Sequence, residues 1–192
     1  MFVDSHCHLD KLGKTPEELA AAVAFAKQRG VEHMLCVAVS VNEFDTMLDT
    51  VKGFEHVSVS CGVHPCYEDE MTDYATLLEY AQRPEVVAVG ETGLDYYHST
   101  DTKAVQQASF IDHIHVASKV KKPLIIHTRN AREDTIALYR EHMNEDTSGV
   151  LHCFTESLEM AQHAIELGLY ISLSGIVTFK TATELQAVAK AV

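Results

Sequence analysis

Short runs rich in β-branched residues alternate with longer amphipathic stretches along the chain, and this alternation constrains the fold most strongly. Continuous apolar runs of this length are typical of strands buried on both faces of a parallel sheet, with helices packed outside. A chain of 192 residues with 46% hydrophobic residues can bury one sizeable core, so we predict one domain over residues 1–192. The expected strands are residues 2–5, 33–39, 57–61, 86–89, 124–127, 149–152 and 169–172.

Helices are expected between these strands. The first, over residues 15–29, has the clearest start, because Thr15 can cap it, Pro16 suits its first position and Glu17 and Glu18 suit its first turn. Gly30 is expected to end it. The later helices are predicted to begin near Asn42, Thr72, Lys103, Ala131, Ser157 and Thr181.

Seven strands with alternating helices predict an α/β fold of the TIM (β/α)₈ barrel type, incomplete as given. A full barrel takes about 250 residues, so we expect the eighth strand and its helix to lie outside these 192 residues. An open doubly wound sheet is the alternative. A dinucleotide-binding fold of that kind carries a glycine-rich phosphate turn after its first strand, and this sequence has none there.

Composition limits where the protein works and what it binds. The five cysteines are odd in number and irregularly spaced, and the N-terminus shows no secretory pattern, so we expect a cytoplasmic protein without disulfides or a membrane span. The formal net charge is −13, which argues against a broad basic face. A nucleic-acid substrate must therefore be held locally, by metal ions and a few cationic side chains.

Imidazoles and one carboxylate occupy the ends of the expected strands. Parallel strands bring such residues to one rim, which is where a barrel of this type carries its chemistry. The clustered ligand types indicate a divalent-metal site. The candidate metal ligands are His6, His8, Glu91, His127 and His152.

Three of these residues support the metal hypothesis most strongly. His6 and His8 are two residues apart on a strand, so both side chains can point to the same side and bind one ion. Glu91 follows an apolar run and lies between Gly90 and Gly93, where a ligand can approach the backbone closely. Its two oxygens can bridge two ions, which makes Glu91 a candidate catalytic residue.

Further residues are candidates for contacting substrate. His64 can be a metal ligand, a proton donor or a substrate contact, and we favour the last two roles, catalytic or substrate-binding. Arg129 offers a planar fork suited to phosphate, with a surface salt bridge as its alternative. Lys180 follows the seventh strand, where barrel enzymes often bind phosphate, and a solvent-exposed lysine is the alternative. Tyr96 and Tyr97 could stack a base or simply pack.

The seven remaining histidines are assigned surface or structural roles; they are His33, His56, His98, His113, His115, His142 and His163.

Five segments together resemble the TatD-type metal-dependent deoxyribonucleases of the amidohydrolase-like barrel superfamily. They are residues 2–10 (FVDSHCHLD), 62–65 (GVHP), 89–97 (VGETGLDYY), 126–129 (IHTR) and 151–154 (LHCF). The resemblance runs in order along the whole chain, and the combination is more specific than any one piece.

The resemblance implies a TIM barrel with a divalent-metal centre that hydrolyses DNA phosphodiester bonds, chiefly as a 3′→5′ exonuclease. His6, His8, Glu91, His127 and His152 match the family's metal ligands, and His64, Arg129 and Lys180 match positions near substrate. The family has a further metal-ligating aspartate, in a Glu-Thr-Asp motif after strand eight, which we expect to lie outside this chain.

The expected cofactors are two divalent ions. Imidazole ligands suit Zn²⁺ or Mn²⁺, whereas the family is described as working with Mg²⁺. The expected partner is DNA with a 3′ end, single-stranded or nicked, and the full-length form is expected to be monomeric. Two alternatives remain open: another amidohydrolase-type hydrolase, for example a D-aminoacyl-tRNA deacylase, and a metal-binding fragment without catalysis. Truncation predicts that this chain alone is poorly soluble or oligomeric and nearly inactive.

Overall fold

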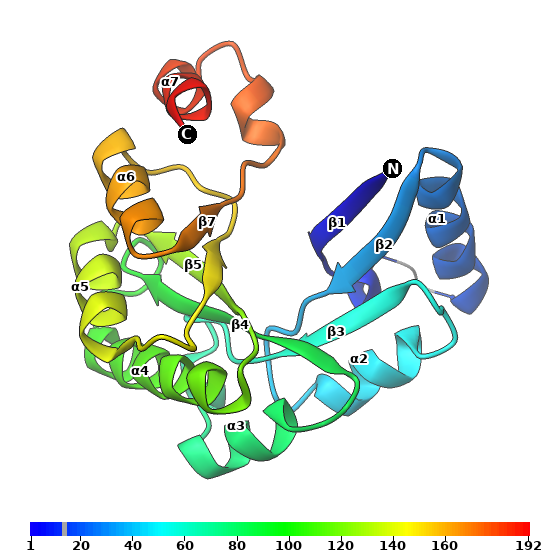
Figure 1. The fold of residues 1–192 in the computed structure, drawn as a ribbon. Coiled ribbons are helices and arrows are strands. Elements are labelled where there is room, and N and C mark those ends of the chain that lie inside the picture. The colour runs from blue at the N-terminus through cyan, green and yellow to red at the C-terminus, as the bar shows by residue number, and fades with distance from the viewer. Residues whose placement is uncertain (13–14) are drawn as a thin grey trace.

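The computed structural model describes residues 1–12 and 15–192. Within them, the strands form one parallel sheet whose order follows the chain, from β1 at one edge to β7 at the other. The sheet curls into a half-barrel with the helices outside it (Figure 1). The strands are β1 (Phe2–Cys7), β2 (Val31–Cys36), β3 (Val57–Cys61), β4 (Val86–Asp95), β5 (Leu124–Arg129), β6 (Gly149–Leu151) and β7 (Leu169–Ile171).

The fold class predicted from the alternation is confirmed, with differences at the strand ends. β2 begins at Val31, two residues earlier than expected, and ends at Cys36, three residues earlier than expected. The prediction that β4 ends at Val89 was wrong, because β4 stays paired with β5 as far as Asp95, opposite Arg129. Glycines in the sequence suggested a strand end, whereas in the structure they accommodate a neighbouring backbone.

The helices lie outside the sheet, and three of them begin after a residue whose side chain caps the helix. Thr15 and Glu18 form a reciprocal capping box at the first helix. Asp73 and Ser157 each accept a hydrogen bond from the backbone N–H three residues later. The helices are α1 (Pro16–Gln28), α2 (Phe44–Val51), α3 (Tyr74–Ala81), α4 (Lys103–Val120), α5 (Arg132–His142), α6 (Leu158–Glu166) and α7 (Thr183–Ala191). Three short 3₁₀ helices are η1 (Leu9–Lys11), η2 (Glu68–Glu70) and η3 (Gly175–Thr178).

The main core lies between the outer face of the sheet and the helices. Leu124 and Ile126 of β5 are fully buried in it, together with the helix residues Phe44, Phe110 and Tyr139. Each such side chain contributes about 1.5–3 kcal/mol through removal from water. A smaller apolar cluster of Val37, Ala88 and Ile125 lies apart from this core. Because side chains alternate along a strand, His127 points to the same face as Ile125, away from the helices.

Both edges of the half-barrel are open among the described residues: β1 pairs with β2 and β7 pairs with β6. Apolar side chains are exposed at both, with Phe2 on β1 and Tyr170 on β7. The five cysteines all lie in the described part and are free, as predicted. No helix within residues 1–12 and 15–192 has the length and apolar character needed to cross a membrane.

Candidate metal centre

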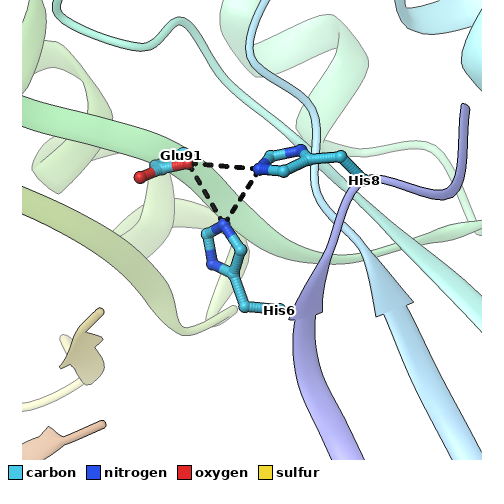
Figure 2. Close-up of side chains that lie close together, drawn as sticks. All are labelled: His6, His8 and Glu91. Atoms are coloured by element: carbon cyan, nitrogen blue, oxygen red, sulfur yellow. Dashed lines mark hydrogen bonds and ion pairs between the residues drawn. The ribbon is translucent and has the colours of Figure 1, made fainter. Parts of the chain in front are cut away.

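His6 and His8 converge on Glu91 at the rim of the half-barrel (Figure 2). His6 Nε2 lies 3.2 Å from Glu91 Oε2, and His8 Nε2 lies 3.9 Å from the same oxygen. The two ring nitrogens are 3.3 Å apart. The expectation that side chains two residues apart on β1 point to the same side is therefore met, although β1 ends at Cys7, between the two histidines.

The carboxylate turns its second oxygen to another pair of imidazoles. Glu91 Oε1 lies 3.4 Å from His127 Nδ1 and 3.7 Å from His64 Nε2. We call the His6, His8 and Glu91 Oε2 set the N-terminal half of the site, and the His64, His127 and Glu91 Oε1 set the β5 half. One buried carboxylate thus separates two groups of nitrogen atoms.

The donor set of the N-terminal half fits a divalent cation. His8 Nδ1 lies 2.8 Å from the Val37 carbonyl oxygen and must donate to it, so the neutral ring directs the Nε2 lone pair toward His6 and Glu91. Lone pairs facing a carboxylate repel it unless a cation lies between them. Bonds of about 2.0–2.2 Å to a tetrahedral ion place its ligand atoms about 3.4 Å apart, close to the spacings of this set.

Burial and hydrogen bonds set opposite trends in the pKa of Glu91. Burial would raise it, but the His127 and His6 rings beside the carboxylate outweigh burial and hold the pKa well below its usual range. The His127 pKa is raised: burial would lower it, and Glu91 and Asp95 more than compensate. An ionised carboxylate at the centre is the state that a cation site requires.

A local irregularity in β4 turns Glu91 toward these imidazoles. The pairing of β4 with β5 shifts register between Val89 and Thr92, and Glu91 lies inside this interval. Glu91 therefore lies within the strand, and the expectation that it directly follows a strand was wrong. Gly93 pairs with His127, and a Cβ at Gly93 would collide with the His127 carbonyl oxygen. Its φ of +130° also suits glycine alone.

His152 enters the same cavity without joining either half. The cavity, of about 380 Å³, is lined by both sets of imidazoles and by His152 and Cys153. The His152 ring stacks on the His6 ring with centroids 3.3 Å apart, and burial lowers its pKa to about 4. Among the described residues, the clusters of close ligand atoms do not include His152. Its role as a ligand stays a prediction that requires its ring to turn away from His6.

The two cationic candidates lie outside the cavity lining. The Arg129 guanidinium stacks 4.4 Å from the centroid of the Tyr97 ring, which is itself exposed. Tyr96 is instead buried, and its hydroxyl donates to Asp134, so packing explains it. Lys180 is exposed just beyond η3. The structure thus brings His64 to the centre and leaves Arg129 and Lys180 around it.

Three residues near the centre, Asp95, His98 and Cys66, were not among the site residues predicted from the sequence. Asp95, at the end of β4, accepts from His127 Nε2 at 3.0 Å, from His98 Nδ1 at 2.8 Å and from the Cys66 thiol at 3.5 Å. His98 had been grouped with the surface histidines. A carboxylate at the end of an apolar strand, in the motif Gly93-Leu-Asp95, was the available signal.

Comparisons with known proteins identify the family. The model of the family described as TatD related DNase matches residues 3–192. An Escherichia coli K12 relative, described as the uncharacterized metal-dependent hydrolase YcfH, is 46% identical over 191 residues, which cover 98% of this chain and 72% of the relative. The 3′-5′ ssDNA/RNA exonuclease TatD of Salmonella typhimurium is 31% identical over 155 residues, covering 80% of this chain and 60% of that protein.

The crystal structure of YjjV, a TatD homologue from Escherichia coli, superposes with a TM-score of 0.91 at 27% identity, covering all of this chain and 74% of that one. The chain belongs to the TatD family.

Proposed function

We propose that this chain is a metal-dependent hydrolase that cleaves phosphodiester bonds in DNA, acting as a 3′→5′ exodeoxyribonuclease. The observation that carries the proposal is Glu91, whose two oxygens face separate sets of imidazoles. A carboxylate placed in this way suits two divalent ions that share it. Two relatives support the class: one is described as a metal-dependent hydrolase and another as a single-stranded DNA and RNA exonuclease.

The chain's own residues divide the work of holding two ions. His6 Nε2, His8 Nε2 and Glu91 Oε2 would hold one, and His127 Nδ1 and Glu91 Oε1 would hold the other, with His152 beside them. Imidazole and carboxylate ligands suit Zn²⁺ or Mn²⁺, and the carboxylate also suits Mg²⁺. Bound divalent ions supply a Lewis acid for a phosphoryl oxygen and lower the pKa of water.

His64 suits a hydrogen-bond donor rather than a ligand. Its Nδ1 accepts the backbone N–H of Cys66 at 3.1 Å, so the proton of the neutral ring is on Nε2, facing the cavity. Burial lowers the pKa of His64 to about 4, which keeps the ring neutral near pH 7. We assign His64 the task of donating a hydrogen bond to a phosphate oxygen of the substrate and orienting it.

Substrate contacts farther from the centre are assigned to Arg129, Tyr97 and Lys180. Tyr97 is exposed and backed by the Arg129 guanidinium, an arrangement on which a nucleobase or a phosphate could rest. A chain of net charge −13 needs such local contacts, because its overall field repels a polyanion.

A 5′-labelled single-stranded DNA oligonucleotide with Mn²⁺ tests the proposal in a version of the chain extended to the length of the Escherichia coli K12 relative, of which the matched residues cover 72%. Stepwise shortening from the 3′ end is expected, with loss of cleavage in Glu91→Gln, because Gln keeps the volume and removes the charge. Glu156→Gln is the matched control: Glu156 is also buried, but its partner is Arg132, outside the cavity. Cleavage by Glu91→Gln within a few-fold of the parent, or hydrolysis of aminoacyl esters without hydrolysis of DNA, would contradict the proposal.

A further inference from the structure

Asp95 is a fully buried carboxylate with many hydrogen-bond donors around it. Its Oδ1 accepts the backbone N–H groups of Tyr97 at 3.0 Å and His98 at 2.9 Å. Its Oδ2 accepts from the His127 ring, the His98 ring and the Cys66 thiol. Both oxygens therefore act as acceptors, and the carboxyl group has no proton of its own to donate.

This charge state determines which nitrogen of His127 carries the proton. Because Oδ2 can only accept, His127 must donate through Nε2–H. The neutral ring then has its lone pair on Nδ1, the atom that faces Glu91 Oε1 at 3.4 Å.

The main chain of Asp95 is also held in place by hydrogen bonds. Its N–H donates to Gln106 Oε1 at 2.8 Å, and its carbonyl oxygen accepts from Gln106 Nε2 at 3.1 Å. Gln106 is itself fully buried in α4. Asp95 also pairs with Arg129 in the sheet, two residues beyond His127. The carboxylate and the imidazole are thus held on neighbouring strands in a defined relation.

We propose that Asp95 is the positioning residue of the β5 half, holding His127 in the Nε2–H tautomer so that Nδ1 is free to bind a cation shared with Glu91. The inference rests on the proposed function for the presence of the cation. Histidines that bind metals commonly donate their second N–H to a carboxylate, which fixes the ring and strengthens the ligand. His8 obtains the same control from the Val37 carbonyl, through the opposite nitrogen.

Asp95→Asn tests the tautomer directly. The two backbone N–H groups at Oδ1 favour the amide oxygen there, so the NH₂ group of Asn would occupy the Oδ2 position and face His127. His127 Nε2 must then accept, and the proton moves to Nδ1. Long-range ¹H–¹⁵N spectra of the metal-free protein at alkaline pH separate the two tautomers, with the His127 signal assigned from its loss in His127→Gln. The parent is expected to show Nε2–H and the variant mainly Nδ1–H.

Zn²⁺ titration against a competing chelator gives an independent result. Asp95→Asn should weaken one binding step about 10–100-fold and leave the step that belongs to the N-terminal half unchanged. His98→Asn is the control, because it removes another partner of Asp95 and keeps the His127 contact. In a His127→Gln background, Asp95→Asn should have no further effect on Zn²⁺ binding.

Three results would overturn the inference: an unchanged His127 tautomer in Asp95→Asn, equal weakening of both binding steps, or additive effects with His127→Gln. A variant that loses the cooperative unfolding of the parent is replaced by Asp95→Ser in the same spectra, where Nε2–H should no longer be the single form. These readouts use no DNA, so the tautomer result stands even if the chain fails to cleave nucleic acid.

Discussion

The two halves of the site are built in different ways around one carboxylate. The N-terminal half takes both imidazoles from one segment, two residues apart, and a main-chain carbonyl orients one of them. The β5 half takes Glu91 from β4, His127 from β5 and His64 from the loop after β3, and the side chain of Asp95 orients His127. A half fixed by local geometry should tolerate changes elsewhere, whereas a half fixed by strand register should respond to any change in that register.

Removing one imidazole from each half should give the largest effects and separate the two. His6→Gln is expected to weaken one Zn²⁺ binding step and His127→Gln the other, each by at least about a hundredfold, since loss of a supporting partner alone costs about 10–100-fold. Isothermal titration of the apoprotein measures both steps. Loss of both steps in each variant would mean that the halves act as one indivisible site.

Gly93→Ala should damage the β5 half selectively. A Cβ at this position meets the His127 carbonyl oxygen at a φ of +130°, so we expect a loss of about 3 kcal/mol in unfolding free energy and weaker Zn²⁺ binding by the β5 half. Gly53→Ala is the matched control, because nothing lies within 4 Å of the added methyl group. Urea denaturation compares the two. Equal stability of the two variants would contradict the close approach of β4 and β5.

Acid should destabilise the fold next to the β5 half, because buried His113 becomes protonated when the chain unfolds. This histidine, assigned a surface or structural role from sequence, is fully buried; its Nδ1–H donates to the Ser109 carbonyl oxygen and its Nε2 accepts the Val63 N–H, next to His64. Burial lowers its pKa from 6.5 to about 4. The unfolded chain therefore binds the proton first, and stability present above pH 6.5 is lost as the pH falls toward 4.

The expected loss from His113 between pH 7 and pH 5 is about 2 kcal/mol. Urea midpoints at the two pH values measure it. His113→Gln should be less stable at neutral pH with a shallower pH dependence, whereas His115→Gln, an exposed position on the same helix, should keep the parental dependence. If His113→Gln keeps the parental pH dependence of stability, His113 is not the source of the acid sensitivity.

Arg129→Ala should have the smallest effect. Arg129 lies outside the cavity lining and stacks on exposed Tyr97, so its loss should raise KM for oligonucleotides about fivefold, a cost of about 1 kcal/mol, with a smaller change in kcat. Arg29→Ala, which removes a similar stacked guanidinium over Phe25, is the control. An unchanged KM would leave Arg129 as a surface contact of Tyr97.

The sequence predicted what depends on local periodicity. The alternation of strands and helices gave the sheet, and the spacing of His6 and His8 gave their convergence. What depends on register between strands could not be predicted. Nothing local indicates that β4 continues past Gly93, that Asp95 lies against His127, or that His152 stacks on His6. Residue type also suggested that Arg129 and Lys180 contact substrate, but it carries no information on their distance from the cavity.

Anomalous scattering from crystals soaked in Mn²⁺ tests the bridging role of Glu91 most directly. The account predicts two peaks, one on each side of the carboxylate, each about 2.0–2.3 Å from one of its oxygens. The first peak should also be bound by His6 and His8, and the second by His127 Nδ1. A single peak bound by the histidines with Glu91 turned away, or two peaks on the same oxygen, would contradict it.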